Sequence, residues 1–89
     1  MARISFTPNL QRHLDVAPCA VIGDTVAAVL AEVFAVNPRL RSYLLDDQGQ
    51  VRRHVMIFVD AERIDDRRHL SDRVGVDSEV YVVQALSGG

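Results

Sequence analysis

The residues best placed for chemistry stand at the end of the sequence. Gly88 and Gly89 are its last two residues, and Leu86 and Ser87 come just before them. Glycine has no Cβ, so the pair can thread a narrow channel and adopt backbone angles that other residues avoid. The five residues 85–89 reach at most about 17 Å when fully extended. The group that this tail would present to a partner is the carboxylate of Gly89, which is a poor electrophile until it is activated.

Side-chain chemistry has little support elsewhere in the chain. His13, His54 and His69 lie in three separate segments without an i, i+4 pair, so we predict no metal site. The single cysteine, Cys19, excludes an internal disulfide, and its apolar surroundings predict a small buried residue rather than a reactive thiol. The serines lack a nucleophile elbow, and no P-loop is present. The sequence therefore predicts no catalytic side-chain set and no bound cofactor.

The composition indicates one small globular domain. The 89 residues are 48% hydrophobic and 25% charged, which is typical of soluble proteins. A net charge of −2 argues against nucleic acid or anionic lipid as a partner. No apolar run approaches the roughly 20 residues that span a membrane, and the first residues show no signal-peptide pattern. A cytoplasmic location is the resulting expectation.

The first quarter of the chain predicts two strands. Residues 3–7 alternate polar and apolar, which favours a half-buried strand with Ile4 and Phe6 facing inward. Residues 8–15 break the pattern and predict a connection. Residues 16–22 predict a second strand, which Pro18 places at a sheet edge because proline cannot donate to a ladder.

A helix start and an apolar stripe follow. Either Asp24 or Thr25 can cap the first amides of a helix. Asn37-Pro38 ends this helix, because the residue before proline is driven out of helical geometry. Residues 40–45 predict a short second helical segment. The stripe at helical spacing consists of Val26, Val29, Leu30, Val33 and Phe34.

The second half of the chain is dominated by strands. Residues 54–59 form the strongest strand pattern, apolar on both faces and therefore central in a sheet. Residues 46–49 and 60–62 predict turns, the second leading into a short strand at 63–64. Residues 79–83 are β-branched and aromatic, as expected for a further strand.

This order of elements predicts an α+β domain in two layers. One main helix with a single apolar stripe covers one face of a mixed sheet of four to five strands. If the first and last strands pair at the sheet centre, the arrangement is a β-grasp, or ubiquitin-like, fold. We assign residues 1–84 to this domain and residues 85–89 to a flexible C-terminal Gly-Gly tail.

Five segments of the chain match one known family: Gly23-Asp24-Thr25-Val26, Asn37-Pro38-Arg39-Leu40, residues 51–59, Asp77-Ser78-Glu79-Val80 and Ala85-Leu86-Ser87-Gly88-Gly89. By these segments the chain resembles the MoaD/ThiS group of ubiquitin-like sulfur carriers over essentially its whole length. Two departures concern the turn at 60–62, where many relatives place Asn-Gly, and Leu86-Ser87, where molybdopterin-type carriers more often have small residues. The second departure leaves the pathway open.

The resemblance implies a function in which Gly89 is the working residue. A ubiquitin-activating-type adenylyltransferase would use ATP to adenylate the Gly89 carboxylate. A persulfide, supplied by a sulfurtransferase or cysteine desulfurase, would then leave a thiocarboxylate on Gly89. A biosynthetic enzyme of molybdopterin, cysteine, thiamine or secondary metabolism would accept the sulfur. In this reading the chain is a carrier rather than an enzyme, and Leu86, Ser87 and Gly88 thread the tail into its partners.

In this function, partner enzymes would dock on the sheet face and on a basic segment. Met56, Phe58 and Tyr81 are the candidate apolar contacts, although aromatic residues at strand spacing more often pack in the core, which for Phe58 means beneath the helix. Arg52 and Arg53 are candidate contacts for an acidic partner surface, where charge sets association rate and specificity. The alternative function is a ubiquitin-like modifier or interaction module conjugated through Gly89.

Overall fold

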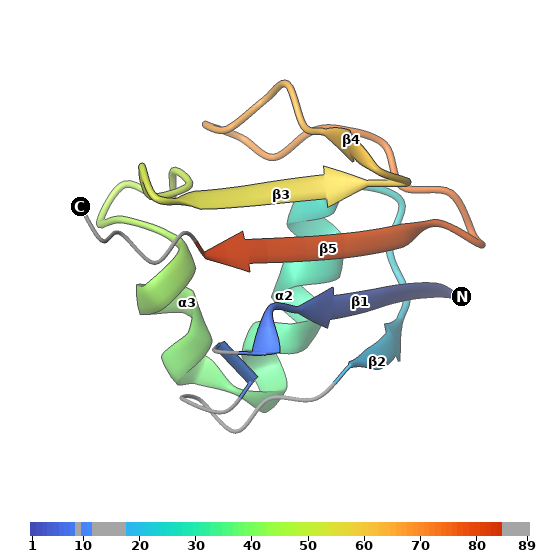
Figure 1. Cartoon of the computed structure of the whole chain (residues 1–89), viewed down its shortest axis with the longest axis horizontal. Helices are drawn as coiled ribbons and strands as arrows, with labels where there is room; N and C mark the ends of the chain where they lie inside the picture. The colour runs from blue at the N-terminus through green and yellow to red at the C-terminus, as the bar shows by residue number, and fades with distance from the viewer. Residues whose placement is uncertain (9, 12–17, 85–89) are drawn as a thin grey trace.

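A mixed five-stranded sheet has one helix behind it, and a second helix packs against the first beside the end of the sheet (Figure 1). The structure is a computed structural model that describes residues 1–8, 10, 11 and 18–84. This architecture confirms the predicted α+β, β-grasp class. In chain order the elements are β1 (Ala2–Phe6), β2 (Cys19–Val21), α2 (Val26–Val36), α3 (Pro38–Leu44), β3 (Val55–Val59), β4 (Glu62–Arg63) and β5 (Glu79–Gln84).

The first and last strands lie side by side in the middle of the sheet. The strand order is β2-β1-β5-β3-β4, and β1 and β5 are parallel with Ile4 opposite Val80. The expected central pairing of the first and last strands is therefore confirmed. The predicted strand at 54–59 becomes β3, which is interior but lies beside the central β5 rather than at the centre itself.

Helix α2 forms as its sequence predicts. Thr25 is the N-cap, and its side-chain hydroxyl accepts a hydrogen bond from the amide of Ala28 at 3.2 Å. Gly23 packs so closely against the first turn that a Cβ would lie 2.9 Å from the amide nitrogen of Val29. The helix ends at Val36, and α3 begins at Pro38, a favoured first helical residue. Of the predicted stripe, Val26, Val29, Leu30 and Val33 are buried, and Phe34 packs against the core half-buried.

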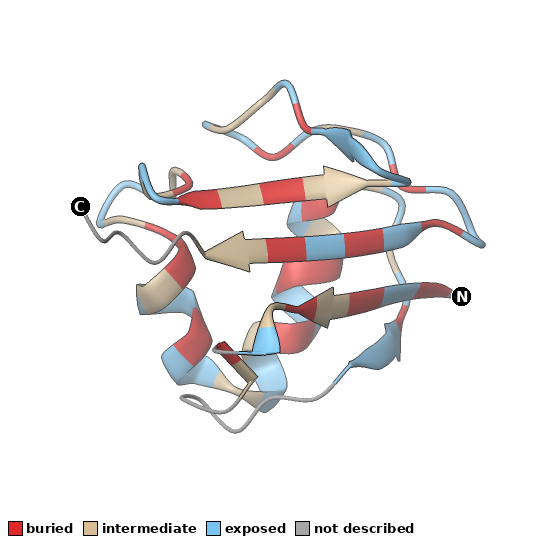
Figure 2. Cartoon of the chain, in the orientation of Figure 1, coloured by how far each residue is buried: buried red, intermediate tan, exposed pale blue. Residues whose placement is uncertain are grey.

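The core lies between the helices and one face of the sheet (Figure 2). Burial alternates along β1 and β5. Ile4, Ile57 and Val80 are fully buried and therefore face the core, whereas the exposed Tyr81 faces away. One sheet face therefore carries the core, and the other is left for solvent or a partner.

No helix in the described ranges is long and apolar enough to cross a membrane.

Residues 8–15 are not wholly a connection, contrary to the prediction. Pro8, Leu10 and Gln11 are helical, and the Gln11 amide donates to the carbonyl of Thr7 at 3.0 Å. Leu10 is fully buried, and this apolar anchor explains why the segment turns inward. The remainder of the predicted connection, residues 9 and 12–15, lies outside the described residues.

The structure contradicts a second prediction, the burial of Cys19 in the edge strand β2. Its edge position is confirmed, and Pro18 immediately precedes its first residue. Cys19, however, is exposed rather than buried. The three-residue strand has a neighbour on one side only, so its first residue is not covered as an interior strand residue would be. Residues 16 and 17 of the predicted strand lie outside the described residues.

The turn between β3 and β4 has an unusual backbone for its sequence. Val59 pairs with Glu62, so the loop consists of Asp60 and Ala61, and both have positive φ, 51° and 70°. Two positive φ angles characterise the type I′ hairpin turn that Asn-Gly favours. The departure from Asn-Gly thus changes the residues but keeps that turn geometry. Ala61 consequently adopts a left-handed conformation that its Cβ makes less favourable than it would be for glycine.

We expect Ala61→Gly to stabilise the fold. Relief of the left-handed Cβ strain, about 1–2 kcal/mol, exceeds the added unfolded-state entropy, for a net gain of about 0.5–1 kcal/mol. Urea unfolding measures the change. Ala31→Gly on the exposed side of α2 is the control, and it should lose about 1 kcal/mol because its backbone is helical. A destabilising Ala61→Gly would contradict the strained-turn interpretation.

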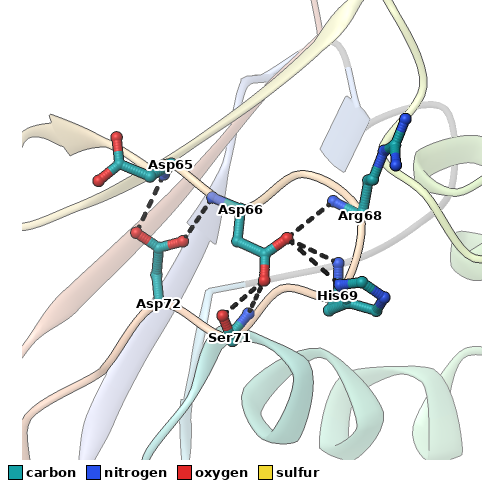
Figure 3. Close-up of polar contacts among 6 residues, drawn as sticks. All are labelled: Asp65, Asp66, Arg68, His69, Ser71 and Asp72. Carbon is teal, nitrogen blue, oxygen red and sulfur yellow. Dashed lines mark hydrogen bonds and ion pairs between the residues drawn. The ribbon is translucent and has the colours of Figure 1, made fainter.

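A second turn, between β4 and β5, is held by two carboxylates (Figure 3). Asp66 accepts hydrogen bonds from the amides of Arg68 and His69 and from the hydroxyl and amide of Ser71. Asp72 accepts from the amides of Asp65 and Asp66 at 3.0 and 2.8 Å. The Ser71 hydroxyl, followed by the His69 amide, lowers the pKa of Asp66 to about 2. These bonds favour the charged form of Asp66.

This lowered pKa predicts an acid-sensitive turn. A folded pKa below the unfolded value of about 3.9 makes Asp66 stabilising above about pH 4, and the contribution disappears as the pH falls to about 2. In Asp66→Asn the urea midpoint should therefore be lower at neutral pH and should fall less over this acid range. Asp65→Asn, a neighbouring exposed carboxylate outside this set of acceptors, is the control. Equal acid dependence of wild type and Asp66→Asn would exclude this role.

Candidate functional site

The described chain ends on the central strand of the sheet. β5 pairs with β1 along one edge and with β3 along the other, and its last residue, Gln84, lies opposite Val55 at the start of β3. β5 is thus paired on both sides up to Val82, and its last residue, Gln84, is held by β3. The tail residues Leu86, Ser87, Gly88 and Gly89 lie outside the described residues.

The three predicted apolar docking residues meet on the face away from the helices. Phe58 lies directly opposite Tyr81, and Met56 lies opposite Val83. Directly opposed residues of neighbouring strands share a face, so the four side chains form one strip, which we call the open-face strip. Tyr81 is 40% exposed, and the other three are half-buried.

The packing alternative for Phe58 is wrong. Its neighbour Ile57 is fully buried on the helix side, and the alternation of a strand sends Phe58 to the other face. Val83 belongs to the strip but is not among the docking residues predicted from the sequence. The signal was present, because Val83 follows Tyr81 at the two-residue spacing of a single strand face.

An aspartate in the β3–β4 turn holds the register of this face. The Asp60 carboxylate accepts from the Ser78 hydroxyl at 2.8 Å and from the Glu79 amide at 2.9 Å. The Asp60 amide donates in return to the Glu79 carbonyl at 2.8 Å. The Glu79 amide, and next the Ser78 hydroxyl, lower the pKa of Asp60. The turn is thus tied to the start of β5, which keeps Phe58 opposite Tyr81.

The two predicted basic docking residues have different surroundings. Arg52 is half-buried and donates from Nε to the Ser42 carbonyl at 2.8 Å, so its guanidinium braces the end of α3. Its own carbonyl accepts from Arg67 Nη2 at 2.6 Å and from the Val55 amide at 3.0 Å. Arg53 is exposed in the turn that this last bond closes.

Arg53 consequently lies beside the exit of the tail. Only one residue, His54, separates it from Val55, which pairs with Gln84. Arg53, His54 and Gln84 therefore lie at the same end of the sheet. His54 and His69 are exposed, and within the described ranges no three His, Cys, Asp or Glu side chains are grouped to hold a metal ion.

Solved structures share this fold over nearly the full length of the chain. A chain of the Amycolatopsis orientalis BexX/CysO complex matches with a TM-score of 0.85 and 18% identity, covering 100% of both chains. Mycobacterium tuberculosis CysO matches with a TM-score of 0.81 and 22% identity, covering 97% of this chain and 100% of its own. SAMP1 from Haloferax volcanii matches with a TM-score of 0.79 and 21% identity, covering 99% and 98%.

These matches establish the fold. The matched structures share the β-grasp arrangement of this domain over 97% or more of the chain. No protein-family model and no curated protein sequence matches the chain.

Proposed function

We propose that this chain is a sulfur carrier whose working group is the C-terminal carboxylate of Gly89. The observation that carries the proposal is the position of Gly88 and Gly89, four and five residues beyond the central strand β5 of a β-grasp domain. A rigid sheet holds the base of the tail, and five residues extend at most about 17 Å from it. That reach suits delivery of a terminal carboxylate into an enzyme while the domain stays outside.

The chemistry requires activation by a partner. The Gly89 carboxylate attacks the α-phosphate of ATP in a ubiquitin-activating-type adenylyltransferase, and pyrophosphate leaves. The terminal sulfur of a persulfide on a sulfurtransferase or desulfurase then attacks the carbonyl carbon, and AMP leaves. A thiol cleaves the resulting acyl disulfide and frees a thiocarboxylate on Gly89. The carrier then donates this sulfur to a biosynthetic enzyme.

The domain would supply the docking surface for these partners. The open-face strip offers two aromatic side chains and one methionine, residue types that are enriched in protein interfaces. Arg53 at the tail exit adds a positive charge on the side where the tail enters the partner. Such a charge speeds association with an acidic surface rather than adding much affinity. One of the structures that share this fold is a BexX/CysO complex, which supports partner binding in general.

A ubiquitin-like modifier is the second candidate. It is favoured by one observation, the fold shared with small archaeal modifier protein 1. The two candidates differ in the fate of Gly89, which is a thiocarboxylate in one and an amide on a target lysine in the other. Mass spectrometry of the affinity-tagged chain recovered from its host distinguishes them. Gly89 in amide linkage to lysines, without thiocarboxylate, would overturn the carrier proposal.

A further inference from the structure

A row of four directly opposed side chains crosses the sheet on the face away from the helices. Tyr81 on β5 lies opposite Ser5 on β1 and opposite Phe58 on β3. Phe58 in turn lies opposite Arg63 on β4, the strand at the sheet edge (Figure 1). Directly opposed residues share a face, and the burial of Ile64, the next residue along, on the core side agrees with this placement of Arg63. The aromatic pair of the open-face strip therefore has an arginine beside it.

The charge of Arg63 has no partner within the described part of the chain. Arg63 is exposed, and its side chain there forms no hydrogen bond and has no carboxylate within 4.0 Å. The carboxylate of Asp60, in the turn just before β4, is directed to β5 by its bonds to the Ser78 hydroxyl and the Glu79 amide. A guanidinium stays charged and offers five N–H donors in a fixed fork that matches a carboxylate. These donors are available to a partner.

Two other charged residues lie on this face of the described strands, and they oppose each other. Arg3 on β1 lies directly opposite Glu79 on β5, so their opposite charges offset each other across one strand pair. Arg63 is opposed instead by Phe58, which has no charge. The face therefore presents an apolar centre with one unbalanced positive charge beside it. Such a surface is complementary to a protein surface that carries a carboxylate beside an apolar side chain.

We infer that Arg63 is a specificity-determining residue of the docking surface. It selects a partner surface on which a carboxylate lies beside the apolar group that packs on Phe58 and Tyr81. The inference rests on the proposed function, and the partner it concerns is the activating enzyme. A charge at the edge of an interface acts chiefly on the association rate and on the exclusion of wrong partners, whereas a central aromatic anchor holds the complex together. An enzyme surface with a positive charge at this place would be repelled.

The test measures association and dissociation rates of the full chain with the host's activating enzyme over a range of salt concentrations. Wild type is compared with Arg63→Glu, with Arg63→Gln and with Arg39→Glu. Arg39 is also an exposed arginine, but it lies on helix α3 instead of the sheet. Arg39→Glu changes the net charge by the same amount as Arg63→Glu. Thermal melting checks that each variant is folded.

At low salt we expect Arg63→Glu to associate about 10-fold more slowly than wild type, and Arg63→Gln about 3-fold more slowly, because the attraction to the carboxylate is reversed or removed. Arg39→Glu should stay within about 2-fold of wild type. At about 1 M salt, where the Debye length is about 3 Å, both Arg63 variants should approach the wild-type rate. Phe58→Ala should instead dissociate faster at every salt concentration.

Two results would overturn the inference. Wild-type association rates in both Arg63 variants at low salt would show that no partner carboxylate lies near position 63. An equal loss in Arg39→Glu would show that the net charge matters and the position does not. In both cases wild type still binds the enzyme, so the proposed function stands. A wild-type chain that the enzyme neither binds nor adenylates would instead overturn the proposed function, and the inference with it.

Discussion

Replacing Gly89 by alanine is expected to slow adenylation of the chain on the order of 100-fold while leaving its melting temperature unchanged. A Cβ at this position would obstruct a narrow channel and bar backbone angles that glycine can adopt, so the carboxylate would be misplaced at the α-phosphate of ATP. The domain should be unaffected, because the described sheet ends at Gln84, five residues earlier.

The measurement is pyrophosphate exchange catalysed by the host's activating enzyme. Gly88→Ala should behave similarly, since this residue must enter the same channel. Circular dichroism and thermal melting of each variant separate a blocked tail from a damaged fold. Wild-type exchange kinetics in either variant would count against a tight channel for the tail.

The second large effect is a difference between substitutions at two adjacent residues of β3, one affecting partner binding and the other stability. Phe58→Ala should weaken binding of the activating enzyme by about 30-fold, the loss expected when an aromatic anchor of an interface is removed. Its unfolding free energy should change by no more than about 1 kcal/mol, because Phe58 is half-buried on the open face. Ile57→Ala should instead destabilise the domain by about 2–5 kcal/mol, because Ile57 is fully buried in the core.

Urea unfolding and titration calorimetry of the two variants measure these effects separately. The folded fraction of Ile57→Ala should bind the enzyme with wild-type affinity. Tyr81→Ala, which removes the partner of Phe58 across the strands, should weaken binding in the same way as Phe58→Ala. Unchanged affinity in both open-face variants would remove this face from the docking surface.

Much of the fold follows from local sequence patterns. The alternation of residues 3–7 and the helical stripe from Val26 to Phe34 each matched an observed element, because each has one apolar face against the core. The orientation of Phe58 did not follow, since residues 54–59 are apolar on both faces and the alternation gives no contrast. Its pairing with the exposed Tyr81 and the burial of its neighbour Ile57 settle the face.

The features that sequence patterns missed depend on distant pairs or on strand position. The carboxylate of Asp60 binds Ser78 and Glu79, which follow it by 18 and 19 residues. The proximity of Arg53 to the tail exit depends likewise on the pairing of Val55 with Gln84. The apolar residues around Cys19 in the sequence predicted that it is buried. Its exposure follows from the edge position of a very short strand.

The central claim concerns the chemical state of Gly89, and an intact mass spectrum tests it most directly. The chain is incubated with the host's activating enzyme, ATP and a sulfur donor, and a reaction without ATP is the control. The carrier function predicts a species heavier by the exchange of one oxygen for one sulfur, located at Gly89 by fragmentation and absent without ATP. An unchanged mass in a reaction that thiocarboxylates the host's other carriers would contradict it.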